Sequence, residues 1–320
     1  MRALTRNLSA ILIYAALLVG TILAVYLMLP KPYIKQIIGN RVSAPRNKKG
    51  AVQNSGAPLR IGIAGMTSPA VSVATSKALL AYISDKLKVP VELYQRKSYA
   101  EINDLLAKNE IDFAFVCTGG YAAVADQVEV IAAPIFRGKP AYNSYIIANK
   151  NSGISSLADL KGKSFAFTDP LSLSGSKYPK WLLNKEGYRL KDFFAKVVYT
   201  YNHDNSIAMV QNRLVDAAAV DSLIYEYLNQ KNPSQLSNIN VIFRSVDLPS
   251  PPIVATKKLN RQLKQKIIAT LGGMSGDAKG RRILKTLGYD GFATAESGLL
   301  NLEDYRTIEA TYPEETEGVR

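Results

Sequence analysis

The stretch FAFTDPLSLSGSKYPKWLL, residues 165–183, contains the clearest local pattern in the chain. It begins with an apolar run typical of a buried strand and ends with apolar residues at helical spacing. Between these parts, two serines alternate with leucines, and Gly175 follows. This order predicts a tight strand-to-helix corner that presents hydroxyls and backbone N–H groups, although serines that only cap a helix would leave the same pattern.

Predicted strands alternate with predicted helices after residue 58. The predicted strands are 59–63, 91–94, 112–116, 144–148, 164–168, 216–220, 241–244 and 253–256. The predicted helices are 73–87, 99–109, 119–126, 180–186, 205–212, 222–230, 263–274, 281–287 and 302–310. Such alternation indicates α/β architecture, with parallel or mixed sheets covered by helices.

Small hydroxyl residues and glycines gather in the loops that follow the predicted strands. These loops are 64–69, 117–121, 168–175 and 201–206. Ligands of open α/β sheets bind at the carboxyl ends of strands. A helix that starts there offers unpaired N–H groups and a partial positive charge. Several such loops together therefore predict a site for an oxyanion that uses no cationic side chain, whereas each loop alone could be an ordinary helix cap.

Enzymatic and metal chemistry find little support in the sequence. Residues 161–164 imitate the end of a phosphate-binding loop, but Leu157 stands where that motif needs glycine. No Gly-x-Ser-x-Gly motif presents a nucleophile, and the chain has one histidine and one cysteine. We therefore expect no enzyme, no catalytic residue, no metal and no cofactor, and we expect Cys117 to be a buried structural thiol.

The N-terminal segment carries a distinct signal. Residues 8–29 form an uncharged apolar run of 22 residues, long enough to cross a hydrocarbon core of about 30 Å. Arg2 and Arg6 precede the run, and no cleavage site of small residues follows it. We favour an uncleaved single-pass membrane anchor over a cleaved signal peptide, with the C-terminal body on the extracytoplasmic, periplasmic side.

A basic linker rich in Pro, Gly and Asn, residues 30–58, follows the anchor. Residues 1–58 hold eight lysines and arginines and no acidic residue, so much of the net charge of +14 belongs to them. The rest of the chain is well mixed in charge. Its sequence does not predict a nucleic-acid interface, because no stretch interleaves lysines with aromatic residues.

Five stretches together resemble the phosphate, phosphite and phosphonate substrate-binding proteins of bacterial ABC importers. They are RIGIAGMTSPA (60–70), PVELYQRKSYAEINDLLAKNEIDFAFVCTGGYA (90–122), NSYIIANKNSGISSLADLKGKSFAFTDPLSLSG (143–175), TYNHDNSIAMVQNRLVDAAAVDS (200–222) and, more weakly, LPSPPIVA (248–255). The resemblance implies the type II periplasmic binding protein fold, in which two α/β lobes enclose a ligand cleft. The first lobe would comprise residues 59–141 and 250–320, and the second residues 142–249, with crossings near 141–144 and 247–252.

The resemblance also implies ligand-binding residues. These are Tyr99, Tyr121, Ser172, Ser174, Gly175, His203, Asp221, Thr67 and Ser68. The tyrosines would offer hydroxyls, the serines and glycine an oxyanion cradle, and the histidine an N–H donor. Asp221 would meet an amine or a protonated oxygen. The family often has threonine where this chain has Leu173, so one hydroxyl of the cradle is missing here.

The function that this resemblance implies is capture of a small phosphorus oxyanion (phosphonate, phosphite or phosphate) for an ABC permease and its ATPase. Two alternatives stay open at this point. The lobes could be the sensing ectodomain of a membrane signalling partner, or a structural protein that kept the fold and lost its ligand.

The anchor can be tested on the expressed protein. If residues 8–29 span the membrane uncleaved, the full chain should stay in the membrane fraction after a high-salt wash, and N-terminal sequencing should begin near Met1. A mature protein that begins beyond residue 30 would refute the anchor.

Overall fold

The computed structural model describes residues 42–43 and 57–313. Among the helices that it describes, none is long and apolar enough to span a membrane. The predicted span, residues 8–29, lies outside the described residues. A two-residue strand, β1 (Val42–Ser43), precedes the folded body.

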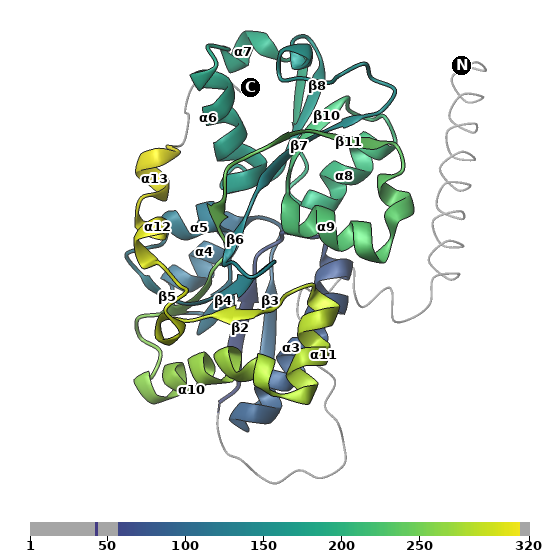
Figure 1. The fold of residues 1–320 in the computed structure, drawn as a ribbon. Coiled ribbons are helices and arrows are strands. Elements are labelled where there is room, and N and C mark those ends of the chain that lie inside the picture. The colour runs from purple at the N-terminus through teal and green to yellow at the C-terminus, as the bar shows by residue number, and fades with distance from the viewer. Residues whose placement is uncertain (1–41, 44–56, 314–320) are drawn as a thin grey trace, which may run out of the picture. The chain divides into compact units, whose positions relative to one another are not determined.

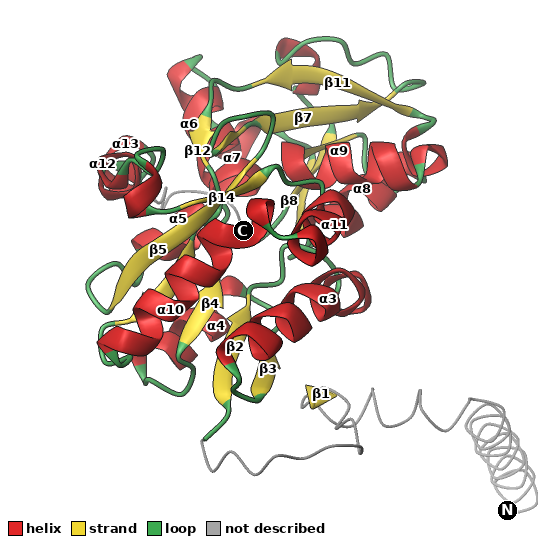
Figure 2. Cartoon of the chain, turned by 60° about the horizontal axis from the view of Figure 1, so that its bottom comes forward, coloured by secondary structure: helices red, strands yellow, loops and turns green. Residues whose placement is uncertain are grey.

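The first lobe is built on a mixed sheet (Figure 1). Its strands lie in the order β3 (Val91–Gln95), β2 (Leu59–Ile63), β4 (Phe113–Phe115), β13 (Ile253–Thr256), β5 (Val128–Ile135) and β14 (Gly291–Ala293). Its helices are α3 (Pro69–Leu87), α4 (Tyr99–Ala107), α5 (Thr118–Ala122), α10 (Arg261–Gly272) and α11 (Ala278–Leu287), with a 3₁₀ turn, η4 (Gly273–Gly276), between the last two. Figure 2 shows α3, α10 and α11 together on one side of these strands.

The second lobe has its own sheet. Its strands lie in the order β11 (Ile239–Arg244), β7 (Ser144–Asn149), β10 (Ala217–Asp221), β8 (Ser164–Phe167) and β9 (Lys196–Tyr199). Its helices are α6 (Tyr178–Lys185), α7 (Leu190–Phe193), α8 (His203–Gln211) and α9 (Ser222–Lys231). A single π-helical turn, η2 (Leu173–Lys177), precedes α6, and two 3₁₀ turns, η1 (Ala158–Leu160) and η3 (Pro233–Leu236), lie in the connections.

Two short strands connect the lobes. β6 (Ala141–Tyr142) pairs antiparallel with β12 (Leu248–Pro249), so Tyr142 lies opposite Leu248. The chain ends in a 3₁₀ turn, η5 (Ala295–Ser297), and the short helices α12 (Leu302–Arg306) and α13 (Ile308–Thr311). Tyr305 packs in the core of the first lobe, whereas Ile308 packs in the core of the second. These terminal helices therefore contact both lobes beside the connecting strands.

Strand direction brings the polar loops together. β2 runs parallel to β3 and β4, and β8 runs parallel to β9 and β10, so within each lobe these strands end at one edge of the sheet. The loops after the two sets of strands meet across the gap between the lobes. The N–H of Tyr99, at the start of α4, donates to Asp169 Oδ2 of the second lobe at 2.9 Å. We call the region where these strand ends and helix starts of both lobes come together the cleft, because ligands of open α/β sheets bind at such strand ends.

Local sequence explains why the helices start where they do. Ser98 and Glu101 form a capping box at α4, in which each side chain accepts an N–H from the other residue's backbone. The apolar residues of α4 recur at helical spacing and are buried, namely Ile102, Leu105 and Leu106. The cap fixes the first turn, and the apolar stripe fixes which way Tyr99 points.

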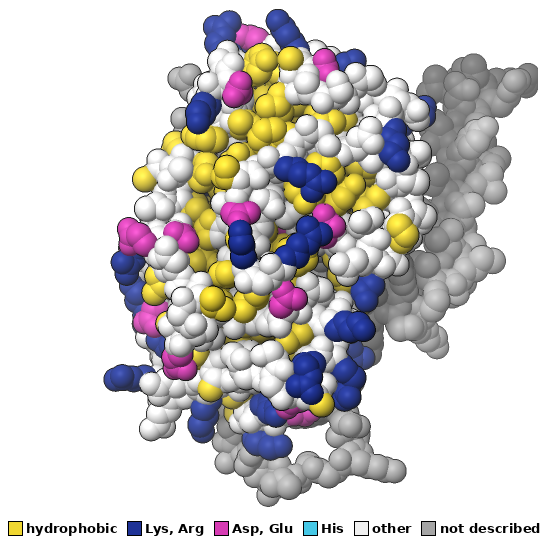
Figure 3. All heavy atoms as spheres, in the orientation of Figure 1, with side chains coloured by type: hydrophobic (Ala, Val, Ile, Leu, Met, Phe, Trp, Pro, Cys, Tyr) yellow, Lys and Arg dark blue, Asp and Glu magenta, His cyan; other side chains and the backbone are white. Residues whose placement is uncertain are grey.

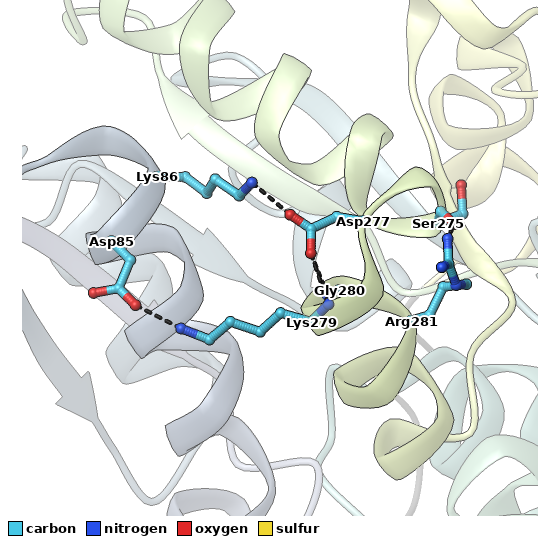
Figure 4. Close-up of polar contacts among 7 residues, drawn as sticks. All are labelled: Asp85, Lys86, Ser275, Asp277, Lys279, Gly280 and Arg281. Atoms are coloured by element: carbon cyan, nitrogen blue, oxygen red, sulfur yellow. Dashed lines mark hydrogen bonds and ion pairs between the residues drawn. The ribbon is translucent and has the colours of Figure 1, made fainter.

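Helix α3 is held against α11 far from the cleft. Figure 4 shows two ion pairs between these helices, Lys86 with Asp277 at 2.5 Å and Lys279 with Asp85 at 2.6 Å. Asp277 also caps α11 by accepting the N–H groups of Lys279 and Gly280. All four ionic side chains are at least partly exposed, so the pairs add modest stability, but they fix the far end of α3.

Gly280 generates a prediction about this packing. A Cβ at this position would lie 2.2 Å from the carbonyl oxygen of Met274, which belongs to the backbone and cannot rotate away. Gly280→Ala should destabilise the fold by about 1–3 kcal/mol through overpacking, less about 1 kcal/mol gained in helix propensity. Gly273→Ala is the matched control, because a Cβ there meets nothing within 4 Å. A melting temperature lowered equally in both variants, or in neither, would contradict this assignment.

Candidate functional site

The first serine of the corner at residues 168–177 stabilises the turn by capping it. Ser172 has an extended backbone, and its Oγ accepts the N–H of Gly175 at 3.0 Å, so this side chain is the cap of the η2 turn. The hydroxyls of Ser174 and Ser176 lie further into the turn, are fully buried and have no hydrogen-bond partner. A single π-turn of this kind is rare and often marks a functional site.

Gly175 is required for packing. A Cβ there would lie 1.8 Å from Thr168 Oγ1 and 2.9 Å from His203 Cε1. The absence of a side chain at this position therefore lets Thr168 and His203 pack closely onto the turn. The corner and the histidine loop therefore belong to one cluster.

Buried polar atoms without partners define the site. They include Tyr99 Oη, Tyr142 Oη, Thr168 Oγ1, Ser174 Oγ, Ser176 Oγ and His203 Nε2. Buried polar groups in native proteins are nearly always paired, and an unpaired one costs about 1–3 kcal/mol. Six in a few connected loops therefore indicate a shared partner. We call these six atoms the donor cluster.

Electrostatic coupling places the two tyrosines of the donor cluster in the same neighbourhood. Burial raises the pKa of Tyr99 and of Tyr142 well above the usual value, and Cys117 and Asp221 raise both further. The hydroxyl of Ser174 lies close enough to Tyr142 to lower that pKa again in part. Because their pKa values are raised, both phenols stay protonated at neutral pH and can donate.

His203 is held as a neutral donor. It begins α8 and is fully buried, and Figure 3 shows no histidine on the surface drawn there. Burial lowers its pKa to about 3, so the ring is uncharged at neutral pH. Its Nδ1 accepts the N–H of Asp221 at 3.0 Å, which places the proton on Nε2. That Nε2–H is the unpaired group of the donor cluster.

Asp221 contacts the donor cluster in two ways: its carboxyl group raises the pKa of both tyrosines, and its backbone N–H holds His203. It ends β10 and caps α9, with Oδ1 accepting the N–H of Leu223 at 2.6 Å. Burial raises its pKa to about 7, although the amides of Leu223 and Ile224 lower it in part. Near neutral pH the carboxyl can therefore donate or accept a proton.

Cationic side chains are absent from this neighbourhood in the part of the chain that the structure describes. The buried Lys177 pairs with Glu309, and Lys180 lies over the rings of Phe167 and Tyr199. Within the same residues, no group of three or more His, Cys, Asp or Glu side chains could hold a metal. The donors on offer to an anion are neutral O–H and N–H groups.

The structure brings together only part of the predicted site. Tyr99, Ser174 and His203 belong to the donor cluster, Asp221 adjoins it, and Gly175 allows its close packing. Ser172 is the helix cap. The N–H of Ser68 donates to Asp204, and the carbonyl of Thr67 accepts from Asn202 at 3.3 Å, so these backbone groups contact the second lobe.

Tyr121 and Leu173 point elsewhere. The ring of Tyr121 packs edge-on against Tyr305, with centroids 5.9 Å apart, and the side chain of Leu173 lies in the apolar core of the second lobe. Cys117 is buried as predicted, and its Sγ lies 3.9 Å from Ser172 Oγ.

Three members of the donor cluster were missed by sequence reasoning. Thr168 and Ser176 belong to the corner itself, and their hydroxyls could have been included with those of its other serines. Tyr142 lies in the connecting strand β6, and the residues next to it in the sequence form no motif that indicates a binding site. Its place in the cluster is shown by its neighbours in space, because Cys117, Asp221 and Ser174 all influence its pKa.

Comparison with known proteins identifies the family of this chain. Residues 61–298 match the family model described as ABC transporter, phosphonate, periplasmic substrate-binding protein. The chain is 28% identical over 218 residues to the phosphonates-binding periplasmic protein of Escherichia coli, a match that covers 65% of this chain and 63%, less than two thirds, of that protein. A second relative, the probable ABC transporter phosphite-binding protein PhnD1 of Prochlorococcus marinus, is 29% identical over 109 residues, covering 32% of this chain and 37% of that protein.

Solved structures share the fold. A binding protein component of an ABC phosphonate transporter from Pseudomonas aeruginosa superposes with a TM-score of 0.72 at 24% identity, covering 79% of this chain and 87% of its own. PhnD1 from Prochlorococcus marinus in complex with methylphosphonate gives 0.71 at 21% identity, covering 79% and 96%. The predicted α/β fold of two sheets, like that of periplasmic binding proteins, is confirmed. With three quarters of its length matched by the family model, the chain belongs to the periplasmic phosphonate substrate-binding proteins of ABC transporters.

Proposed function

We propose that the chain binds a small phosphorus oxyanion, a phosphonate or phosphite, between its lobes and delivers it to an ABC permease, with residues 8–29 holding the body at the membrane. The donor cluster is the observation that supports this most. Six buried O–H and N–H groups without partners match the several acceptor oxygens of one phosphorus group. The family is one of binding proteins, so no catalytic step is involved.

The donor cluster can replace the hydrogen bonds that an anion loses when it moves from water into the protein. A hydrogen bond to a charged group contributes about 1.5–3 kcal/mol, more than one between neutral groups. The ligand would also supply the partner that each buried donor lacks, so its binding removes an existing penalty. Neutral donors fixed by packing can therefore hold the anion without an arginine or lysine, much as helix N-termini do.

Asp221 favours ligands that bring a proton. A carboxylate next to an oxyanion repels it, but a carboxyl with a pKa near 7 can share a proton with a P–OH group. A singly charged phosphonate or phosphite would meet less repulsion than a doubly charged ion. The buried position of this carboxyl therefore favours the hydrogen-bearing form of the ligand.

Ser174→Ala tests the proposed site. Wild-type protein should bind methylphosphonate or phosphite in a calorimetric titration, and the variant should bind at least about tenfold more weakly, since one charged hydrogen bond is lost. Its melting temperature without ligand should not fall, because the Ser174 hydroxyl has no partner there. Ser237→Ala, an exposed serine whose Oγ accepts from Gln211, is the matched control. Unchanged affinity with a lowered melting temperature would show that Ser174 is structural.

Asp221→Asn tests the protonation of the carboxyl. The folded pKa of about 7 lies above the ordinary pKa of 3.8 for this side chain, so the stability contributed by the protonated form is fully present below about pH 4 and is lost as the pH rises through 7. Asparagine can still cap α9 but does not ionise. The free energy of unfolding of the variant, relative to wild type, should therefore improve by at least about 1.4 kcal/mol between pH 5 and pH 8.

The two pH values must be compared without ligand, by denaturant unfolding of both proteins. His203 is present in both, so its own titration largely cancels in the difference. A difference in stability that is the same at pH 5 and pH 8 would contradict a raised pKa at Asp221.

A further inference from the structure

The start of α8 reaches across the cleft to the loop that precedes α3. Both oxygens of Asp204 accept the N–H of Ser68, at 2.9 and 3.1 Å. Asn202 Nδ2 donates to the carbonyl of Gly65 at 2.6 Å, and the N–H of His203 donates to the carbonyl of Met66 at 3.0 Å. These bonds join residues 135 or more positions apart in the chain, and each joins one lobe to the other. Figure 1 shows α8 and α9 of the second lobe facing the upper end of α3.

A second carboxylate makes the same kind of contact. Asp169 Oδ2 accepts the N–H of Tyr99 at the start of α4. Two helices of the first lobe, of 19 and nine residues, thus begin against carboxylates of the second lobe. The positive end of a helix dipole favours such a charge, so each contact attracts the lobes to one another.

These contacts use none of the donor cluster. Asp204 binds only the backbone N–H of Ser68, and the six unpaired atoms lie on other groups. The start of α3 is therefore already occupied by the protein's own carboxylate when the lobes are together. A ligand would gain nothing from that helix end, although the sequence had suggested Thr67 and Ser68 as ligand contacts.

We propose that Asp204 is a positioning residue for closure, one that raises ligand affinity by stabilising the closed arrangement of the lobes without touching the ligand. A ligand that enters the open arrangement and is held when the lobes close can leave only after they reopen, so its apparent affinity rises with the stability of the closed arrangement. Removing the bonds made by Asp204 lowers that stability and lets bound ligand escape sooner.

Asp204 is a better test position than Asp169. The other oxygen of Asp169 accepts the N–H of Leu171 at 2.9 Å, inside the corner itself, so replacing that side chain would disturb the donor cluster directly. Asp204 has no such bond within its own loop. Asp204→Asn keeps the size of the side chain and removes its charge, whereas Asp204→Ala removes both acceptors.

The experiment compares full-length wild type, Asp204→Asn and Asp204→Ala. Radiolabelled methylphosphonate would be released from each protein and followed by rapid filtration. We expect Asp204→Ala to speed dissociation by about tenfold or more, because a hydrogen bond to a charged acceptor contributes about 1.5–3 kcal/mol and about 1.4 kcal/mol is a factor of ten, and we expect Asp204→Asn to speed it less. The association rate should change by less than about twofold. Asp192→Asn is the control, because Asp192 is an exposed carboxylate of the same lobe paired with Arg189.

Two outcomes would overturn the proposal. One is a dissociation rate equal to wild type in Asp204→Ala, and the other is a variant whose association rate alone falls, which would indicate direct attraction of the ligand. Small-angle scattering of the ligand-free proteins gives an independent measurement. The alanine variant should have a larger radius of gyration than wild type, and equal radii would also overturn the proposal.

The ligand part of this test rests on the proposed function, and the scattering part does not. If wild type binds neither methylphosphonate nor phosphite, the proposed ligand is wrong. The scattering comparison then still decides whether Asp204 holds the lobes together.

Discussion

Pairing of buried polar groups is the constraint on which this structure depends. When the two lobes meet, phenols from Tyr99 and Tyr142, the hydroxyls of the corner and the Nε2–H of His203 all leave water together. Among the described residues these atoms have no hydrogen-bond partner, so closure alone is penalised. In the proposed function, an anion removes that penalty because it accepts several of these bonds at once. That proposal couples binding and closure through one electrostatic requirement.

Other hydrogen bonds between the lobes favour closure, and they need no ligand. Asp204 and Asp169 of the second lobe bind backbone N–H groups at the start of α3 and α4. These bonds favour the closed arrangement, whereas the donor cluster disfavours it until an acceptor arrives. The balance between the two sets decides how strongly a ligand shifts the lobes, as expected for a protein that reports occupancy by its shape. The raised pKa of Asp221 makes this balance depend on pH near neutrality, whereas the imidazole of His203 stays neutral there.

The sequence predicts well those parts of the fold in which the residues that form a turn or cap a helix also carry the polar groups of the site. The corner at residues 168–177 needs a strand, a cap, small hydroxyls and a glycine in that order, and His203 begins a helix next to a strand end. The prediction omitted β5, β9 and β14. β5 contains Pro134, which argues against a strand in a sequence, and β9 and β14 have only four and three residues.

The roles of the remaining site residues depend on contacts with residues far away in the chain, which the sequence does not predict. Tyr121 follows a glycine pair as expected, but its ring packs edge-on against Tyr305, 184 residues later. The amide of Ser68 is bound by Asp204, 136 residues away, and the groups that influence Tyr142, among them Ser174 and Asp221, come from distant parts of the chain. The serine that caps the turn could not be told from the serine that faces the cleft, since both fit the same pattern until the bond from Gly175 to Ser172 is seen.

The chain has a single histidine, so nitrogen NMR of ¹⁵N-labelled histidine tests the central claim directly. We expect a neutral ring with its proton on Nε2, no titration between pH 5 and pH 8, and a downfield shift of the Nε2–H resonance when methylphosphonate or phosphite is added. A ring that titrates near its usual pKa of about 6.5, with signals that neither anion changes, would contradict the account.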